Sequence, residues 1–235
     1  MTTTLITGAN KGLGLQTARR LTRAGHTVYL GARDARRGAQ AARAVGARAL
    51  LLDVADDDSV ATAVEQVREH TGHLDVLVNN AGVAGPMRTA DEVTAADMLA
   101  VYDTNVFGAV RVTQAFLPLL HRSASPVVVN VSSGLGSLAV AADPAAHASR
   151  VPLWISSLPY NSSKAALNMV TVLYARALPR MRINAVDPGH TATDLNGHTG
   201  AQSVEQGTDI IVRMASIGPD GPTGGYYTAD GPMPW

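Results

Sequence analysis

The sequence predicts an α/β fold in which a doubly wound parallel sheet of about seven strands is flanked by helices. Short apolar runs alternate along the chain with longer amphipathic segments, as in strands joined by crossover helices. The 235 residues and 46% hydrophobic content suit one domain, residues 1–235, with a full core. Ligands of such folds bind at the carboxyl ends of the strands, so we expect the functional residues there.

Composition narrows the class of function. Nineteen basic residues balance nineteen acidic ones, so the charge predicts no binding to nucleic acid or to an anionic membrane. No apolar run is long enough to cross a bilayer and no export signal is visible, so we expect a cytoplasmic protein. Because the chain has no cysteine, the catalytic groups must be side chains that react through oxygen or nitrogen atoms, or a cofactor. No third ligand is spaced to complete a metal site with His70 and His73.

The first predicted strand, residues 5–7, leads into a glycine-rich turn with Gly8, Gly12 and Gly14, and a helix follows. Glycines let the backbone approach a ligand closely, and free N–H groups at a helix start face an anion. The Gly-x3-Gly-x-Gly spacing differs from the Gly-x-Gly-x-x-Gly dinucleotide fingerprint. The alternative is that these glycines only form a tight connection between the strand and the helix and bind no ligand.

The second strand, residues 26–31, is followed by Ala32, Arg33 and Asp34. In dinucleotide-binding folds an acid near this strand end binds the ribose hydroxyls of NAD, whereas an arginine accommodates the 2′-phosphate of NADP. We favour Arg33 for the phosphate, because Ala32 takes the last strand position and two further arginines follow. Asp34 then caps the next helix. An ordinary solvated arginine is the alternative.

The third and fourth strands, residues 49–53 and 74–78, enclose a helix over residues 56–68. Asp53 ends the third strand and Asn79 follows the fourth. Both fall at the edge of the sheet where ligands bind, although turn residues commonly end strands there.

A long helix is predicted over residues 94–120, with Asn105 and Gly108 near its middle, and a fifth strand over residues 126–131. Asparagine is a poor residue inside a helix because its side chain competes for backbone hydrogen bonds. Asn105 is therefore either a strained functional position or a solvent-facing one.

The last third of the chain holds two irregular segments. Residues 135–159 contain three prolines and predict an inserted loop beside the site, and residues 190–205 form a polar candidate lid. Regular elements are predicted over residues 182–186 (strand), 205–215 (helix) and 224–228 (strand).

The strongest chemical signal is Tyr160 with Lys164 at the start of an apolar helical run. Residues four apart share a helix face, so both can act on one substrate atom. A nearby ammonium lowers the pKa of a phenol, which starts near 10, and makes it a usable general acid or base. Lys164 and Lys11, in the glycine turn, are the only lysines, whereas the other basic residues are arginines. This pattern indicates that both positions need the compact ammonium group of lysine.

Seven motifs follow one another along the chain: Thr7–Gly14, Asp53, Asn79–Gly82, Asn105, Val131–Ser133, Tyr160-x3-Lys164 and Pro188-Gly189-x3-Thr193. In this order they resemble the motifs of the classical short-chain dehydrogenase/reductase family over essentially the whole chain, and they are most similar to those of its monomeric carbonyl reductases. The resemblance implies a single Rossmann-like NAD(P)-binding domain, NADP(H) as the cofactor and a small carbonyl or alcohol as the substrate.

The resemblance implies four catalytic roles. Tyr160 would protonate the carbonyl oxygen, while Lys164 lowers the pKa of Tyr160 and holds the nicotinamide ribose. Ser133 would hydrogen-bond the substrate oxygen. Asn105 would support a water that links Lys164 to solvent.

The resemblance also implies binding residues. For the cofactor they are Gly8, Asn10, Lys11, Gly12, Leu13, Gly14, Arg33, Asp53, Val54, Asn79, Ala81, Gly82, Tyr160, Lys164, Pro188, Gly189, Thr191 and Thr193. Among these, Asn10, Lys11 and Arg33 would lie near the 2′-phosphate. Asp53 would lie at the adenine, Asn79 at the ribose and residues 188–193 at the carboxamide. Candidate walls of the substrate site are Leu135, Trp154 and His190.

One departure from the family concerns the 27 residues between Ser133 and Tyr160, about twice the separation in its short forms. Either the segment bends back and restores the serine to the site, or Ser133 is displaced. We expect the apolar residues 153–158 to fold onto the helix that begins at Tyr160 and to cover the face used for tetramers. A monomer or weak dimer would result.

Three functions remain open from the sequence. The first is an NADPH-dependent carbonyl reductase acting on a ketone, aldehyde or quinone. The second is an alcohol dehydrogenase working oxidatively with the same residues. The third is a non-catalytic NADP(H)-binding sensor, which the intact proton-transfer residues disfavour.

Overall fold

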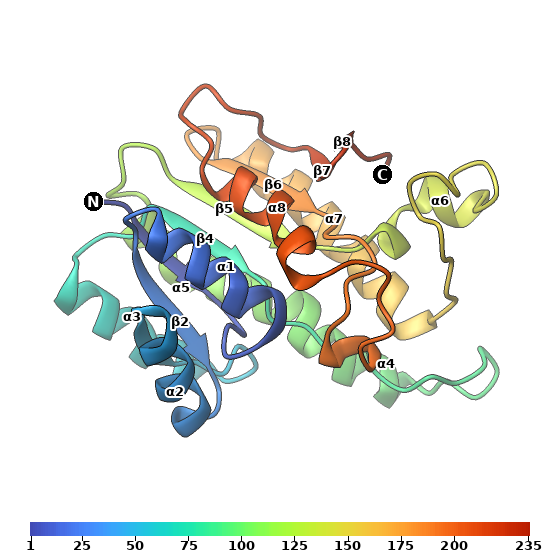
Figure 1. Ribbon diagram of the computed structural model, residues 1–235, viewed down its shortest axis with the longest axis horizontal. Helices are drawn as coiled ribbons and strands as arrows, with labels where there is room; N and C mark the ends of the chain where they lie inside the picture. Colours follow the sequence, from blue (N-terminus) through green and yellow to red (C-terminus); the bar gives the residue numbers. More distant parts are fainter.

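An eight-stranded sheet forms the middle layer of the computed structural model, which describes residues 1–235 (Figure 1). The strand order is β3-β2-β1-β4-β5-β6-β7-β8, and every neighbouring pair is parallel except β7 with β8. The strands are β1 (Thr3–Ile6), β2 (Thr27–Ala32), β3 (Arg48–Leu51), β4 (Val76–Asn79), β5 (Val127–Val131), β6 (Arg182–Val186), β7 (Tyr226–Thr228) and β8 (Gly231–Pro232). The predicted doubly wound sheet is confirmed, and the unpredicted β8 is too short to leave a pattern.

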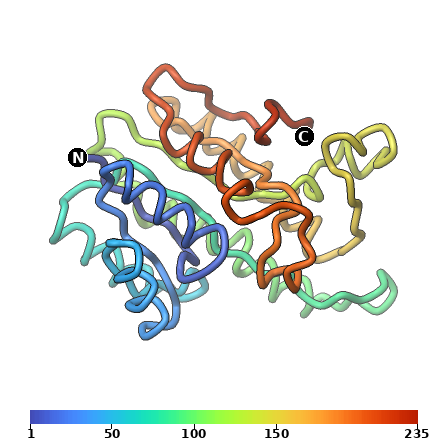
Figure 2. The backbone as a smooth tube through the Cα atoms, viewed as in Figure 1, coloured from blue at the N-terminus to red at the C-terminus, as the bar shows by residue number.

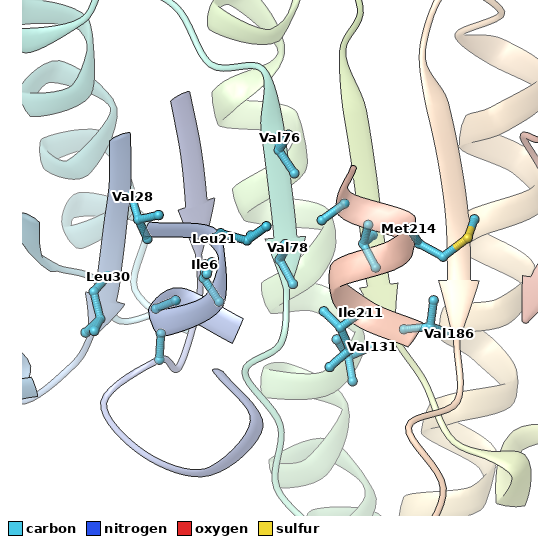
Figure 3. Packing of buried hydrophobic residues seen from close by; sticks show 14 of the residues in the cluster. Ile6, Leu21, Val28, Leu30, Val76, Val78, Val131, Val186, Ile211 and Met214 are labelled. Atoms are coloured by element: carbon cyan, nitrogen blue, oxygen red, sulfur yellow. The ribbon is translucent and has the colours of Figure 1, made fainter. Parts of the chain in front are cut away.

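Helices cover both faces of the sheet, and none is long and apolar enough to span a membrane. One face carries α1 (Gly12–Arg23), α2 (Ala35–Val45) and α8 (Val204–Ala215). The other carries α3 (Asp57–His70), α4 (Ala95–Tyr102), α5 (Gly108–Leu120) and α7 (Leu158–Ala177). Because successive residues of a strand point to opposite faces, Leu5 packs into the second layer and Ile6 into the first. Figure 3 shows Ile211 and Met214 of α8 in the first layer with the strand residues.

The predicted long helix contains a wide turn that the sequence did not suggest. Between α4 and α5, residues Asp103–Phe107 form a π turn, and the N–H of Gly108 donates to the carbonyl of Asp103, five residues back. A π turn contains one residue more than a regular α-helical turn, so its side chains point in directions that a regular helix would not give them. Such turns are frequent at functional sites. Asn105 lies in the turn and is 1% exposed, so the solvent-facing alternative is wrong.

The 135–159 segment is more ordered than predicted and packs elsewhere than expected. It contains a 3-10 turn (Gly134–Gly136) and the short helix α6 (Leu138–Ala142), and it lies beside the C-terminal end of the chain (Figure 2). Val140 and Val151 pack against Tyr226 and Met233. Leu153 and Leu158 are half exposed, and so are Met169 and Leu173 along α7. The expectation that residues 153–158 fold onto α7 is therefore wrong for Leu153 and Leu158, and Trp154 packs instead against the cluster that contains Tyr226 and Met233.

Candidate active site

The glycine turn between β1 and α1 is clamped to the end of β4. Gly8 has a φ of +61°, and a Cβ there would lie 2.8 Å from the Cα of Ala81. The hydroxyl of Thr7 accepts the N–H groups of Asn80 and Ala81, both at 3.0 Å. The amide of Asn80 donates to the carbonyl of Gly8 at 3.2 Å. Only glycine allows this approach and this φ, so the turn is fixed against the neighbouring strand.

The start of α1 offers free N–H groups to an anion. Lys11 precedes the helix, but no side chain caps it, and the first helical N–H to find a carbonyl is that of Leu15, with Lys11. A Cβ on Gly12, whose φ is +54°, would meet only Thr193, at 3.6 Å. The amides of Gly12 to Gly14 therefore have no hydrogen-bond partner within the protein, which fits binding of a dinucleotide pyrophosphate.

The end of β2 presents one unpaired cation. Ala32 is buried, and Asp34 caps α2 by accepting the N–H of Arg37 at 2.9 Å, as predicted. Arg33 between them is exposed and makes no hydrogen bond or ion pair within the protein. Lys11, expected near the same phosphate, instead pairs with Asp194 at 2.7 Å.

At the end of β4, the side chain of Asn79 points into the protein. Asn79 is 4% exposed, and its amide donates to Thr113 at 3.0 Å and to Asn130 at 2.9 Å. Its side chain points between the sheet and α5, so only the main chain of Asn79 is left to meet a ribose, and that contact stays a prediction. At the end of β3, Asp53 accepts the N–H of Ala55 and is partly exposed, and Val54 is buried.

Tyr160 and Lys164 occupy the first two turns of α7, where Pro159 fits the first turn. The Lys164 Nζ lies 5.6 Å from the centre of the Tyr160 ring and donates to the carbonyl of Val131 at 2.8 Å. Lys164 is 4% exposed. The phenol and the ammonium therefore share one helix face, at the carboxyl end of β5.

Ser133 is not displaced by the inserted segment. The chain after it turns back so tightly that a Cβ on Gly136 would lie 2.6 Å from the Cβ of Lys164. The amide of Asn168 on α7 holds this turn by donating to the Gly136 carbonyl at 3.2 Å. The hydroxyl of Ser133 lies close enough to the phenol for its hydrogen bond to lower the pKa of Tyr160. The first of the two alternatives for Ser133 is correct.

Burial dominates the titration of both groups in the protein alone. It raises the pKa of Tyr160 to about 12, the Ser133 hydrogen bond opposes this, and the charge of Asp187 adds to it. Burial lowers the pKa of Lys164 to about 8, and Asp187 opposes that fall. The expectation that Lys164 brings the pKa of Tyr160 below 10 is therefore not met in the protein alone, because burial raises the pKa of the phenol and Lys164 is not among the groups that lower it.

The side chain of Asn105 joins three parts of the site. Its oxygen accepts the N–H of Val83 at 2.9 Å, and its amide donates to the Val83 carbonyl and to the hydroxyl of Ser163. A Cβ on Gly82 would lie 3.4 Å from the Asn105 oxygen and 3.6 Å from the Lys164 Nζ. Asn105 therefore holds the segment after β4 against α7, next to Lys164.

The candidate lid is tied to the end of β6. The Gln202 amide donates to the carbonyl of Pro188 and to the hydroxyl of Thr191, which is buried. Asp194 of the same segment contacts Lys11 and, at 2.8 Å, His198. The segment thus bridges the end of β6 and the glycine turn, across the place predicted for the cofactor.

Of the predicted substrate residues, Leu135 and Trp154 are partly buried against the cluster that contains Tyr226. His190 has a buried Nε2 atom without a hydrogen-bond partner. No group of three or more His, Asp or Glu side chains is placed to hold a metal ion.

Sequence reasoning missed two buried groups beside the catalytic pair. Asp187, directly after β6, is 6% exposed, and Tyr226 of β7 is 2% exposed with an unpartnered hydroxyl. Asp187 precedes Pro188 and Gly189, so it had the appearance of a turn residue. The signal available was its position after four buried residues of β6.

Comparison with known proteins agrees with this geometry. The family model described as short chain dehydrogenase matches residues 2–203. The chain is 37% identical over 229 residues to the short-chain dehydrogenase anuI of Penicillium roqueforti (strain FM164), covering 91% of this chain and 88% of that protein. It is 31% identical over 300 aligned positions to (-)-isopiperitenone reductase of Mentha piperita, with 96% of each covered.

Solved structures show the same fold along the chain. Salutaridine reductase from Papaver somniferum superposes with a TM-score of 0.84 at 27% identity, covering 97% of this chain and 99% of that one. An NADPH-bound carbonyl reductase from chicken fatty liver gives 0.87 at 26% identity, covering 100% and 99%. The family model spans most of the sequence, and the resemblance read from the motifs is confirmed: the chain belongs to the short chain dehydrogenase family.

Proposed function

We propose that this protein is an NADPH-dependent carbonyl reductase that converts a ketone, aldehyde or quinone to an alcohol with Tyr160 as general acid. The observation that carries the proposal is the meeting of Tyr160, Ser133 and a buried Lys164 at the carboxyl end of β5. Proton transfer by a positioned phenol at this edge of the sheet fits reduction of a small carbonyl compound.

Each side chain has one task in the proposed reaction. Bound NADPH supplies the hydride. The hydroxyl of Ser133 donates to the carbonyl oxygen and stabilises the negative charge that develops there. Tyr160 then gives its proton to the same oxygen. Lys164, held by the Val131 carbonyl, supplies positive charge beside the phenol and favours loss of that proton.

The protonation state of Tyr160 suits reduction. With a pKa of about 12 the phenol carries its proton at neutral pH, which is the form that a general acid needs. Oxidation of an alcohol would need the phenolate as base. The relatives include (-)-isopiperitenone reductase and salutaridine reductase, and also (+)-neomenthol dehydrogenase, so their names are compatible with either direction.

Residues at the carboxyl ends of β1 and β2 support NADPH as the cofactor. The open amides at the start of α1 suit the pyrophosphate, and unpaired Arg33 beside buried Ala32 suits a 2′-phosphate. One structural neighbour at 26% identity is NADPH-bound.

The test is a panel of ketones, aldehydes and quinones, followed through NADPH absorbance, with NADH in parallel. We expect turnover of at least one carbonyl compound with NADPH. Turnover only of alcohols with NADP⁺ would instead establish the dehydrogenase. Tight NADPH binding without turnover in either direction would establish the sensor.

We also propose that the protein is a monomer or weak dimer. The half-exposed Met169 and Leu173 leave an apolar strip on α7 that a partner could cover in part. Light scattering at micromolar concentration tests this, and a mass about four times 24.4 kDa would contradict it.

A further inference from the structure

Two buried charges of opposite sign lie in the active site. Among nineteen basic and nineteen acidic residues, only Lys164 and Asp187 are buried, at 4% and 6% exposure. An isolated buried charge is costly, so buried charged groups are normally paired or neutralised. Two such groups in one site, and none elsewhere, indicate that each stabilises the other.

The sheet brings the two groups together. Val131, whose carbonyl accepts from the Lys164 Nζ, is the register partner of Val186, the residue before Asp187. The Oδ1 atom of Asp187 accepts the N–H of Gly189 at 2.9 Å, and a Cβ on Gly134 would lie 2.8 Å from Oδ2. The carboxylate is therefore fixed by backbone close to the ammonium, without an ion pair within 4.0 Å.

Few other titratable groups surround Asp187. Helix α7 contributes Tyr160 and Lys164, β7 contributes Tyr226, and His190 follows on the next loop. Strand β5 and the Gly134–Gly136 turn carry no titratable side chain. The only positive charge that acts on the carboxylate is that of Lys164.

We propose that Asp187 is a positioning residue whose carboxylate is the counter-ion that keeps Lys164 charged in the buried site. This inference rests on the proposed function, in which the positive charge of Lys164 favours loss of the proton from Tyr160. The effects on the two groups are reciprocal. Asp187 opposes the fall in the pKa of Lys164, and Lys164 opposes the burial that raises the pKa of Asp187. Asp187 also raises the pKa of Tyr160.

The charge of Asp187 therefore acts on both members of the catalytic pair. Without it, Lys164 should lose its proton at lower pH, because desolvation would act unopposed. Tyr160 should also ionise at lower pH. An Asp187→Asn variant keeps one oxygen for the Gly189 N–H and removes the charge, and it replaces the other oxygen, which lies at Gly134, by an NH₂ group.

The presence of only two lysines makes the test direct. Cofactor-free protein labelled with [ε-¹³C]lysine should give two side-chain NMR signals, one from exposed Lys11 and one from Lys164. Asp187→Asn should lower the titration midpoint of Lys164, which is about 8 in the parent, by about one unit, the low end for loss of a nearby opposite charge. The matched control Asp230→Asn, at an exposed turn of the same sheet, should leave it unchanged.

An unchanged Lys164 midpoint in folded Asp187→Asn protein would overturn the proposal. If that variant fails to fold by circular dichroism, the reciprocal variant Lys164→Met decides: the ¹³C-aspartate signal of Asp187 should then titrate at higher pH, and an unchanged midpoint rejects the pairing. No substrate or cofactor is present, so this result is independent of turnover. In the active enzyme, Asp187→Asn should also shift the pH profile of kcat to lower pH, which a purely structural role would not do.

Discussion

The protein places a lysine and an aspartate near one another twice, once at the surface and once in the core. Lys11 and Asp194 touch at 2.7 Å, yet their side chains are 59% and 53% exposed. Lys164 and Asp187 do not touch, yet both are buried. Water screens the first pair, so the contact is worth little, whereas burial changes how both groups of the second pair titrate. Burial, more than contact distance, decides which pair matters for function.

The buried region should dominate activity. Tyr160→Phe keeps the ring but removes the proton, so kcat should fall by roughly 10² to 10⁴, the usual contribution of general acid catalysis. NADPH binding should persist. Steady-state kinetics with a substrate from the carbonyl panel measures this, and Tyr174→Phe on the same helix is the matched control. A variant that keeps more than about a tenth of parental turnover would rule out the mechanism.

At the surface, the unpaired Arg33 should contribute more to function than the ion pair of Lys11 with Asp194. Arg33→Ala should weaken NADPH binding by about 1.5 to 3 kcal/mol, the range for a hydrogen bond to a charged group, and leave NADH binding nearly unchanged. Fluorescence titration of both cofactors measures the difference. Arg43→Ala, at an exposed position of α2, is the control. Equal losses for the two cofactors would disprove the assignment of Arg33 to the 2′-phosphate.

Buried Lys164 should also appear in the pH dependence of stability. Its pKa is about 8 in the folded protein and 10.5 ordinarily, so between these values the unfolded chain binds more protons and stability rises with pH. From pH 8 to 9.5 the gain should reach about 2 kcal/mol. Urea unfolding at both pH values measures it, and Lys164→Met should abolish the gain. Parallel curves for parent and variant would refute the burial of a charged lysine.

The exposed pair should give the smallest effect. Asp194→Asn removes one charge from the contact with Lys11, and the free energy of unfolding should change by less than about 1 kcal/mol. Urea unfolding in low and high salt measures it. A loss of several kcal/mol would mean that the surface pair is as important as the buried one.

The parts of the site that could be predicted are those with a local signature. The Asp34 cap, the glycine turn and the spacing of Tyr160 and Lys164 depend on residues a few positions apart, and the structure has all three. Asp187 had no such signature. Its surroundings include Met233, which lies with Asp187 against Gly134 and comes more than forty residues later in the chain.

Two further differences between expectation and structure concern where side chains point, in elements whose positions were predicted correctly. Strand β4 was expected to end near Asn79, and it does. Alternation along the strand, however, puts Asn79 on the α5 side with Leu77, opposite Val78. Asn105 was expected within a helix, and the extra residue of the π turn decides which way it faces. The sequence predicts elements better than it predicts the facing of their polar residues.

The wide turn at Asp103–Phe107 also affects how related sequences should be compared. A regular helix turns about 100° per residue, so losing one residue at any other point would swing every later side chain of α5 away from the sheet. Within the wide turn, a deletion could close the helix into regular geometry and leave both flanks in place. Alignments of this helix should therefore open a gap inside it, at residues 103–107, instead of in the loops at its ends. A homologue that is one residue shorter there would keep the packing of the helix and lose the inward position of Asn105.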